Sequence, residues 1–383
     1  MKILFISHEA TLTGAPILLL RLIEQVKKHS ALEILILVKE GGELEKRFEA
    51  LGKTLVWDRA IPDNFNHRWK NRIYRKIGLR TSTQQQLYKE AILKEVGQAD
   101  IVFNNTIANT ALLKELPLQG KKIFSYIHEL AIVTELLASS EDIAYLGSIS
   151  QKIFVPTLAV KDLFCNKYHL PETRIALLKS IIPQQDGKEI TGSKIVNRPG
   201  GAQFLVGFCG TLDWRKGFEL LPLLARKIVQ EKNVTDIHFV WIGVNKTSRN
   251  YLILHNDLLK LKLDSYFTFI PNEPGIQHYL AQLDVFVLPS REDPFPLVVL
   301  EAACYGVPCI YFRDAGGIAE FCGDDAGIAI DYLDIDGMAD AIIKLKLDQP
   351  ARDALGNCAK EKVAGYSDES FNIRELLEYF NAS

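Results

Sequence analysis

The stretch KILFISHEATLTGAPILLLRLIEQVKK, residues 2–28, contains the structural unit that repeats along the chain. Its short apolar run, residues 3–6, has the length of a buried strand. A polar loop follows, and residues 16–28 then carry apolar side chains at helical spacing, with Pro16 suited to the first helical turn. Alternation of a strand with an amphipathic helix predicts a parallel sheet covered by helices.

The same alternation recurs in both halves of the chain. The strand-like runs are KILFIS, EILILV, DIVFNN and KIFSYIH in the first half, and FLVGFCG, HFVWIG, YFTFIP, VFVLPS and PCIYF in the second. Helical patterns such as TALLKEL, ELLPLLARKIVQE and GIQHYLAQL lie between them. We therefore expect an α/β protein with two doubly wound, Rossmann-like domains that face a cleft.

The stretch between the halves is polar, rich in glycine and poor in large apolar side chains. It predicts an interdomain linker over residues 186–200. The first domain is then expected at 1–185 and the second at 201–365. Residues 366–383 are expected to form a last helix that packs back on the first domain.

Composition excludes several classes of protein. The chain has 383 residues, 48% of them hydrophobic, and a formal charge of -2, so no chain-wide attraction to nucleic acid or anionic lipid is expected. The six cysteines have no CxxC spacing, so we interpret them as reduced and without a metal. The apolar run at the N-terminus is too short for a signal peptide or a spanning helix, which indicates a cytoplasmic protein.

One segment is strongly basic. NHRWKNRIYRKIGLR, residues 66–80, has six basic residues and no acid, with Trp69, Ile73 and Ile77 four residues apart. This pattern is typical of a helix on a membrane surface, and a solvated loop explains it equally well. A nucleic-acid partner is not expected, because the rest of the chain is not basic.

Polar clusters follow the predicted strands, where ligands bind in doubly wound sheets. In the loop HEATLTGAP, Thr13 and Gly14 precede a helix N-terminus that favours an anion or an acceptor. A plain structural connector is the alternative, and the loop lacks the GxGxxG fingerprint of nicotinamide cofactors. His128 follows another strand and is either a site residue or a satisfied structural histidine.

The segment FCGTLDWRKGFELL repeats this arrangement in the second half. Gly210 ends a strand, and Arg215 and Lys216 precede a helix N-terminus, where the helix dipole disfavours cations. A diphosphate would compensate them through charge-assisted hydrogen bonds. A solvated Arg-Lys pair is the alternative interpretation.

The segment SREDPFPLVVLEAA, residues 290–303, carries Asp293 in a loop and Glu301 one turn into the next helix. Ionised carboxylates accept hydrogen bonds from the paired hydroxyls of a ribose or hexose. Acids also favour a helix N-terminus for electrostatic reasons alone. That alternative does not explain the rigid apolar frame of two prolines, Phe295 and Leu297 around these carboxylates.

Together these motifs resemble the retaining GT-B glycosyltransferases of family 4, especially bacterial enzymes that build surface polysaccharides. The resemblance covers nearly the whole chain. DPFPLVVLE, residues 293–301, occupies the family's E-G-F-G-L-x-x-x-E motif, and GTLDWRKG, residues 210–217, occupies G-R-L-x-x-x-K-G. TGAP is similar to the family's Gly-rich loop, IHE to its His-Asp/Glu segment, and AGGIAEF to its G-G-x-x-E stretch.

The resemblance implies roles in the second, donor-binding domain. Glu301 holds the donor ribose, and Asp293 stands where the family's first Glu contacts the transferred sugar, a contact that the shorter Asp can pass to Glu292. Lys216 binds phosphate. Thr211 replaces the usual Arg, and Arg215 is the expected substitute.

Further residues receive implied roles. Phe295, Leu297, Gly210 and Gly14 belong to the implied donor site, with Thr13 and Glu320 as additional candidates. His128 lies beside the transferred sugar, and the first domain binds the acceptor. DID, at residues 334–336, spells a metal motif of a different glycosyltransferase architecture, but we interpret it as a helix cap and assign no metal.

The resemblance thus implies a metal-independent, retaining transfer from a nucleoside-diphosphate sugar to a glycan or lipid-linked acceptor, with no cofactor. Cell-surface polysaccharide synthesis is the expected setting, in the cytoplasm and peripherally at the membrane. Three alternatives stay open: a nicotinamide-dependent oxidoreductase, a non-catalytic nucleotide-sugar-binding protein and a nucleotide-sugar epimerase. The base, sugar, acceptor and oligomeric state do not follow from the residues.

Overall fold

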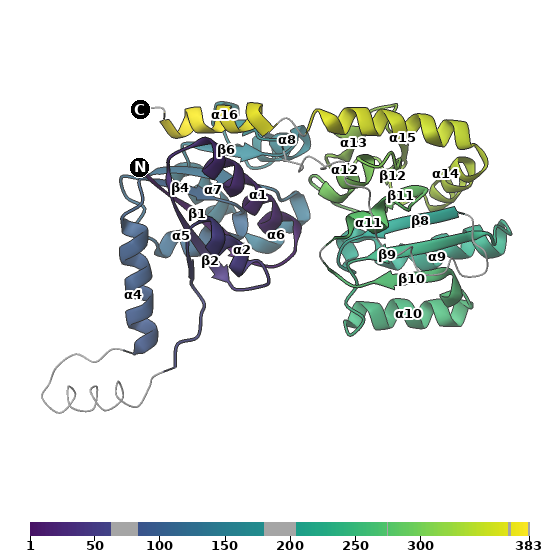
Figure 1. Cartoon of the computed structure of the whole chain (residues 1–383), viewed down its shortest axis with the longest axis horizontal. Coiled ribbons are helices and arrows are strands. Elements are labelled where there is room, and N and C mark those ends of the chain that lie inside the picture. The colour runs from purple at the N-terminus through teal and green to yellow at the C-terminus, as the bar shows by residue number, and fades with distance from the viewer. Residues whose placement is uncertain (63–82, 180–203, 274, 367–368, 382–383) are drawn as a thin grey trace, which may run out of the picture. The chain divides into compact units, whose positions relative to one another are not determined.

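The computed structural model describes residues 1–62, 83–179, 204–273, 275–366 and 369–381. The predicted linker at 186–200 and the basic segment at 66–80 lie outside these residues. Contacts between residues divide the chain into two compact units (Figure 1). Unit 1 comprises Met1–Val155, Lys161–Leu178 and Glu369–Ser383, and unit 2 comprises Pro156–Val160 and Lys179–Asp368.

Unit 1 contains a seven-stranded sheet in the order β3-β2-β1-β4-β5-β6-β7. All neighbouring strands pair in parallel. The chain order reverses between β1 and β4, so the loops after these two strands lie at a topological switch point. The strands are β1 (Lys2–Glu9), β2 (Glu33–Glu40), β3 (Lys53–Val56), β4 (Ile101–Asn104), β5 (Lys122–Tyr126), β6 (Lys152–Val155) and β7 (Ile175–Leu177).

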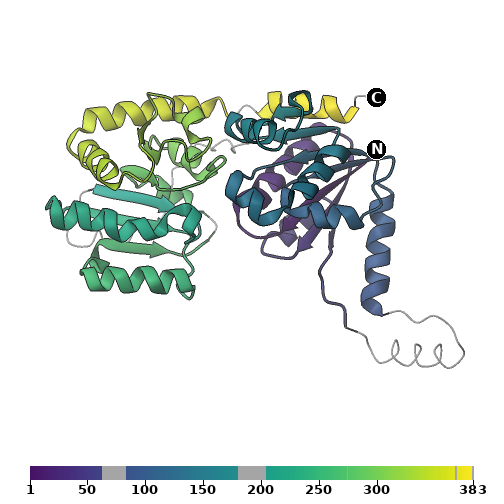
Figure 2. The same ribbon diagram turned by 180° about the vertical axis from the view of Figure 1, so that it is seen from behind.

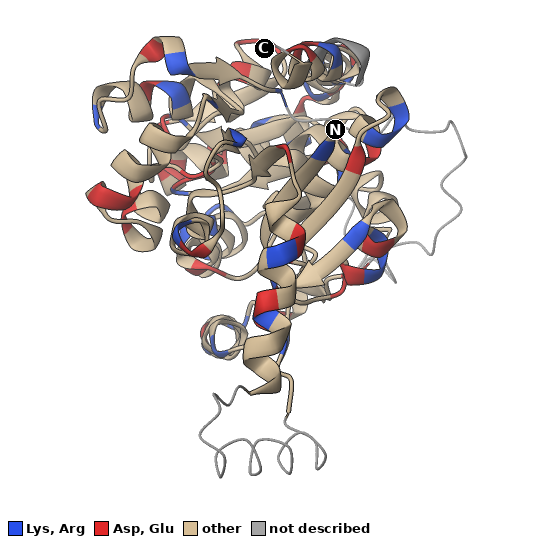
Figure 3. Cartoon of the chain, turned by 90° about the vertical axis from the view of Figure 1, so that its left-hand side faces the viewer, with Lys and Arg blue, Asp and Glu red and all other residues tan. Residues whose placement is uncertain are grey.

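Local sequence signals start several helices of unit 1. Thr83 and Ser139 each form a capping box, with Gln86 and Asp142 respectively, at the helices that follow them. The helices are α1 (Gly14–His29), α2 (Glu45–Leu51), α4 (Gln84–Gly97), η1 (Ile107–Asn109), α5 (Thr110–Glu115), α6 (Ala131–Leu137), α7 (Ser140–Ile149), α8 (Leu158–Asn166), η2 (Glu172–Arg174) and α16 (Glu369–Asn381). The first residues of α8, up to Val160, belong to unit 2. Acidic and basic residues are interspersed along these helices (Figure 3).

The C-terminal helix α16 belongs to unit 1 (Figures 1 and 2). Its Phe380 is fully buried, with ring centroids 6.1 Å from Phe103 on β4 and 5.3 Å from Phe124 on β5. An aromatic ring of this size buries enough apolar surface to fix the last helix to the sheet.

Unit 2 contains a six-stranded parallel sheet in the order β10-β9-β8-β11-β12-β13. The chain order reverses between β8 and β11, which pair through Val285 with Val206 and Phe286 with Gly207. The strands are β8 (Phe204–Cys209), β9 (Ile237–Ile242), β10 (Phe267–Ile270), β11 (Val285–Leu288), β12 (Cys309–Phe312) and β13 (Gly327–Ile330).

Strand residues of unit 2 alternate between two buried clusters, one on each face of the sheet. On β8, Phe204, Val206 and Phe208 join one cluster and Leu205 the other. Helices α9, α10 and α14 contribute to the first cluster, and α11, α12, α13 and α15 to the second. Burial on both faces explains why these strands read as continuous apolar runs.

The helices of unit 2 include several short ones. They are η4 (Trp214–Lys216), η5 (Phe218–Leu220), α9 (Leu221–Arg226), η6 (Lys227–Glu231), α10 (Arg249–Leu261), η7 (Asp264–Tyr266), α11 (Gln277–Leu280), α12 (Leu297–Ala303), α13 (Ile318–Cys322), α14 (Ile335–Leu347) and α15 (Gln349–Ala364). The predicted α/β class with two parallel sheets is confirmed. Within the described residues, no helix is long and apolar enough to cross a bilayer.

Candidate active site

The candidate site in unit 2 lies at the carboxyl ends of β8 and β11. Because these strands are parallel neighbours, the loop after β8 (residues 210–217) and the loop after β11 (residues 289–296) emerge at the same edge of the sheet. Two glycines shape the first loop. Gly210 and Gly217 have φ values of 129° and 71°, which L side chains rarely adopt.

The two loops are joined by hydrogen bonds between their backbones and side chains. Nη1 of Arg215 donates to the carbonyl of Glu292 at 2.8 Å, and the N–H of Arg291 donates to the carbonyl of Arg215 at 2.8 Å. Nη1 of Arg291 also donates to the carbonyl of Trp214 at 3.0 Å. Arg215, the expected substitute for the family Arg at the Thr211 position, thus braces the second loop.

Lys216 and Asp293 form an ion pair across these loops. Their side chains are 14% and 7% exposed, so the pair is largely shielded from water. The hydroxyl of Ser290 donates to the same carboxylate oxygen of Asp293 at 3.3 Å. The phosphate-binding and sugar-binding residues expected from the sequence therefore lie in direct contact, although 77 positions separate them in the chain.

Glu301 lies in α12 and is buried, with 8% of its surface exposed. Its charge affects the pKa of Cys209, the last residue of β8. Burial raises the pKa of the Cys209 thiol to about 12, the charge of Glu301 adds to this rise, and Lys216 opposes it. The carboxylate of Glu301 and the cation of Lys216 thus act in opposite directions on this thiol at the end of β8.

Other residues expected in the donor site have packing contacts. The ring of Phe295 stacks on Tyr366 with centroids 5.8 Å apart, and Leu297 packs against the apolar cluster on the same face of the sheet. Glu292 is 8% exposed, and its carbonyl receives Arg215. Phe295 and Leu297 are therefore half-buried by packing, and Glu292 is buried.

Glu320 has a structural contact that the sequence did not indicate. Its carboxylate accepts hydrogen bonds from the N–H groups of Leu158 and Ala159, both at 3.0 Å, at the start of α8. These N–H groups lack partners inside a helix, and a carboxylate there is electrostatically favoured. Asp334 likewise caps α14 by accepting from Gly337 at 2.9 Å, which confirms the interpretation of DID as a cap.

In unit 1, polar residues gather after β1, β4 and β5. Oδ1 of Asn105 lies 3.1 Å from Nε2 of His128, and Nδ2 of Asn105 donates to the carbonyl of Ala15 at 2.9 Å. Asn105 thus links His128 to the first turn of α1. The sequence placed Asn105 at a strand end but gave no signal that it would hold His128.

His128 is neutral at physiological pH. Burial lowers its pKa to about 3, and the nearby His8 lowers it further in the same direction, while Asn105 opposes the shift. Because Oδ1 of Asn105 can only accept, the neutral ring donates from Nε2 and leaves Nδ1 as an acceptor. The neighbouring Glu129 is buried, which raises its pKa even though Thr106 donates to it.

Glu9 organises the loop that leads to Gly14. It accepts hydrogen bonds from the hydroxyls of Thr11 at 2.7 Å and Thr13 at 2.8 Å, and these outweigh the effect of burial, so the pKa of Glu9 is lowered. The side chain of Thr13 therefore points to Glu9 and does not cap α1. A β-carbon on Gly14 would meet nothing within 4 Å, so the backbone there borders open space.

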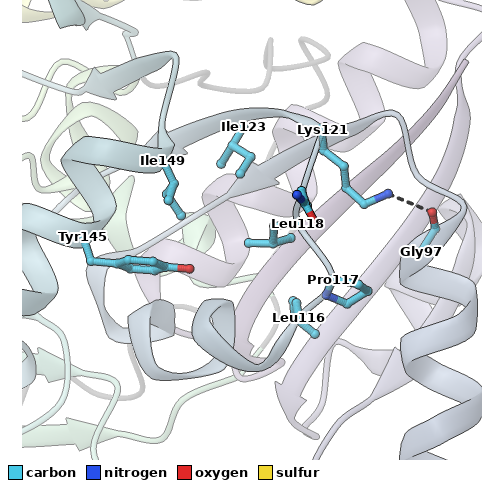
Figure 4. Close-up of a pocket in the computed structure, with 9 residues that line it drawn as sticks. Gly97, Leu116, Pro117, Leu118, Lys121, Ile123, Tyr145 and Ile149 are labelled. Carbon is cyan, nitrogen blue, oxygen red and sulfur yellow. Dashed lines mark hydrogen bonds between the residues drawn. The ribbon is translucent and has the colours of Figure 1, made fainter.

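A separate pocket of about 640 Å³ lies at the opposite edge of the sheet of unit 1 (Figure 4). Its residues precede β4, β5 and β6, so it lies at the amino ends of these strands. The lining residues are Gly97, Leu116, Pro117, Leu118, Gln119, Lys121, Ile123, Tyr145 and Ile149. It contains none of the residues that the motifs predicted, and we do not assign it to the site.

Comparison with known families gives one match to the glycosyl transferases group 1, over residues 193–362. This range contains both loops of the candidate site in unit 2 and helix α12.

Curated relatives include an Escherichia coli UDP-Gal:alpha-D-GlcNAc-diphosphoundecaprenol alpha-1,3-galactosyltransferase, 30% identical over 37% of this chain and 36% of the relative. A Bacillus anthracis N-acetyl-alpha-D-glucosaminyl L-malate synthase is 35% identical over 31% of this chain and 30% of the relative. The Escherichia coli O-antigen biosynthesis glycosyltransferase WclY is 27% identical over 59% of this chain and 64% of the relative. The matches thus span less than two thirds of each of these relatives.

Solved structures resemble the whole chain. Anabaena HepE in complex with UDP-glucose has a TM-score of 0.79 at 16% identity, and S. aureus TarM has 0.73 at 12%, each with complete coverage of both chains. At these identities the likeness shows the fold alone, which is that of the GT-B glycosyltransferases. The expected resemblance to glycosyltransferases and the expected GT-B fold are confirmed.

Proposed function

Because residues 193–362 belong to the glycosyl transferases group 1, we propose that this protein transfers a sugar from a nucleoside-diphosphate sugar to an acceptor hydroxyl, with the anomeric configuration retained. The observation that carries the proposal is the ion pair of Lys216 with Asp293 at the carboxyl ends of β8 and β11, followed in the chain by the buried Glu301 of α12. Two carboxylates and a cation in one partly buried site suit a ligand that combines hydroxyls with phosphates.

Each group has a distinct task in this proposal. Lys216 binds the diphosphate and disperses the charge that grows on it as the glycosidic bond breaks. Glu301 accepts hydrogen bonds from the ribose hydroxyls, and Asp293 from hydroxyls of the transferred sugar. Arg215 donates a hydrogen bond to the carbonyl of Glu292, which holds the two loops together, and its positive charge adds to that of Lys216 near the diphosphate.

Within unit 1, His128 is the residue that we propose contacts substrate. Its ring is neutral, with Nε2 directed to Asn105, so the group it offers a bound sugar is an acceptor nitrogen, Nδ1. The loop from Glu9 to Gly14 is held in shape by the two threonine hydroxyls and offers backbone N–H groups at the start of α1. The acceptor oxygen forms a bond to the anomeric carbon as the bond from this carbon to the phosphate oxygen breaks. The departing phosphate oxygen takes the proton of the acceptor hydroxyl.

For the acceptor, we propose a glycan or lipid-linked hydroxyl in the synthesis of a cell-surface polysaccharide. Support comes from the names of relatives, which include an O-antigen biosynthesis glycosyltransferase and a galactosyltransferase that acts on a diphosphoundecaprenol-linked sugar. Work on a lipid-linked acceptor would place the protein in the cytoplasm, at the inner face of the membrane. We propose that the reaction needs neither a metal nor a cofactor.

A thermal-shift panel of UDP, GDP, ADP and dTDP sugars tests donor binding. A ligand at a hundred times its Kd raises the free energy of unfolding by about 2.7 kcal/mol, so the true donor will stand out. Incubation of that donor with lipid-linked glycans, followed by NMR of the product, then tests transfer and retention. No stabilisation by any nucleotide sugar would contradict the proposal, and binding without transfer or hydrolysis would favour a non-catalytic binding protein.

A further inference from the structure

We infer that the carboxylate of Asp293 pairs with the ammonium group of Lys216 when no donor is bound. The donor's diphosphate must displace this carboxylate from Lys216 before Asp293 can bind the donor's sugar. The inference rests on the proposed function and assigns Asp293 a second task. It makes the two contacts of the donor, one to phosphate and one to sugar, depend on each other.

The ion pair offsets the charge of Lys216 and takes up one of the three N–H donors of its ammonium group. Asp293 is 7% exposed and Lys216 14%, so solvent does not compete effectively for either charge. The alkyl chain of Lys216 lies over Gly210, where a β-carbon would be 3.4 Å from Cε of the lysine. This packing holds the ammonium group near Asp293, and the φ of 129° at Gly210 is one that L side chains rarely adopt.

Exchange requires movement of the Asp293 side chain alone. The backbone of Asp293 is fixed on both sides, because its N–H donates to Ala315 at 2.7 Å and its carbonyl accepts from Gly317 at 3.2 Å. Rotation about the side-chain bonds moves the carboxylate away from Lys216 without disturbing these bonds. Ser290, whose hydroxyl lies 3.3 Å from the carboxylate, is a second partner during this movement.

Charge decides which ligands can cause the exchange. A neutral sugar brings nothing to replace the carboxylate at Lys216, whereas a diphosphate brings more negative charge than Asp293 removes. Once displaced, the carboxylate is a buried charge without its cation, and it needs hydrogen-bond donors. Sugar hydroxyls supply them. The complete nucleotide sugar therefore satisfies both residues, while the nucleoside diphosphate product leaves Asp293 unsatisfied.

The inference predicts an unusual gain of affinity. Asp293→Asn removes the competitor of the diphosphate, so the nucleoside diphosphate should bind at least about tenfold more tightly than to the wild-type protein, a change of about 1.4 kcal/mol. The nucleotide sugar should gain less, because the variant also loses acceptors for its hydroxyls. The affinity ratio between the two ligands should therefore shift toward the diphosphate.

Titration calorimetry of the full chain with UDP, GDP, ADP and dTDP tests this. The matched control is Asp236→Asn, which removes an aspartate paired with Lys346 at 2.6 Å before β9, at the opposite edge of the same sheet. Its nucleotide affinity should equal that of the wild-type protein. Lys216→Met should lose affinity, and Asp293→Ser, checked by thermal unfolding, repeats the test with another side chain.

The outcomes are separable. The inference is wrong if both folded Asp293 variants bind the diphosphate no more tightly than the wild-type protein. In that case, loss of binding in Lys216→Met would still support the proposed donor site. If none of the four diphosphates binds any variant or the wild-type protein, both the inference and the donor site fall.

Discussion

Gly217 approaches Pro289 so closely that a β-carbon on Gly217 would lie 2.1 Å from the carbonyl oxygen of Pro289. This contact brings the loop after β8 against the loop after β11. It also explains why a glycine with φ of 71° follows Lys216. A side chain at this position would separate the loops that carry Lys216 and Asp293.

Gly217→Ala should therefore lower both stability and nucleotide affinity. The positive φ alone costs about 1 kcal/mol, and the clash with Pro289 should bring the total to about 2–4 kcal/mol of unfolding free energy. Gly120→Ala is the matched control, because Gly120 has φ of 74° but a β-carbon there meets nothing within 4 Å. Urea unfolding checks the difference, and equal losses in the two variants would contradict the close packing of the loops.

Glu301→Gln should weaken donor binding by about tenfold or more while the fold is kept. The change preserves shape but removes the charge that accepts ribose hydroxyls, and charged hydrogen bonds contribute about 1.5–3 kcal/mol each. Calorimetry with the donor found in the panel measures the loss. Glu361→Gln, at an exposed position of α15, is the control. A donor Kd unchanged by Glu301→Gln would remove the proposed ribose contact.

The stability of unit 1 should fall as the pH is lowered from about 6.5. The folded pKa of His128 is about 3, below the ordinary 6.5, so between these values the unfolded chain binds a proton that the folded chain does not. Each pH unit in this window costs up to about 1.4 kcal/mol. His128→Gln should flatten this dependence. Urea titrations at several pH values give the free energy of unfolding as a function of pH. If its slope were the same in the variant and the wild-type protein, His128 would take up its proton equally well in the folded and unfolded states.

Transfer activity should survive treatment with EDTA. In the proposed site, Lys216 and Arg215 balance the charge of the diphosphate. Both aspartates of DID have structural contacts instead. Asp334 caps α14, and Asp336 pairs with Lys227 at 2.6 Å. Assays before and after dialysis against EDTA check this. Loss of activity that Mn²⁺ or Mg²⁺ restores would show that a metal takes part.

Alternating strand and helix patterns predicted both parallel sheets, because short apolar runs separated by amphipathic helices are typical of strands that are buried on both faces. The strands that the sequence did not reveal are short: β3, β6 and β13 have four residues and β7 has three. Length alone does not explain why they were missed, because β4, β10, β11 and β12 also have four residues and were predicted. The predicted helix GIQHYLAQL forms only as α11, four residues long.

Motif spacing located the loops of the candidate site, since Lys216, Asp293 and Glu301 each occupy a recognisable position next to a strand. It could not show which partners the side chains choose. Thr13 binds Glu9 instead of capping α1, Glu320 caps α8, and Phe295 stacks on Tyr366. The partners of Glu320 and Phe295 lie far away in the sequence, whereas Glu9 lies four residues from Thr13.

Local spacing of side chains along the chain thus indicated the parallel sheets and the polar strand ends, because periodicity and turn chemistry act between near neighbours. The contact of Lys216 with Asp293 has a different origin. It exists because β8 and β11, far apart in the chain, are adjacent in the sheet, and strand order depends on how all the helices and strands pack together.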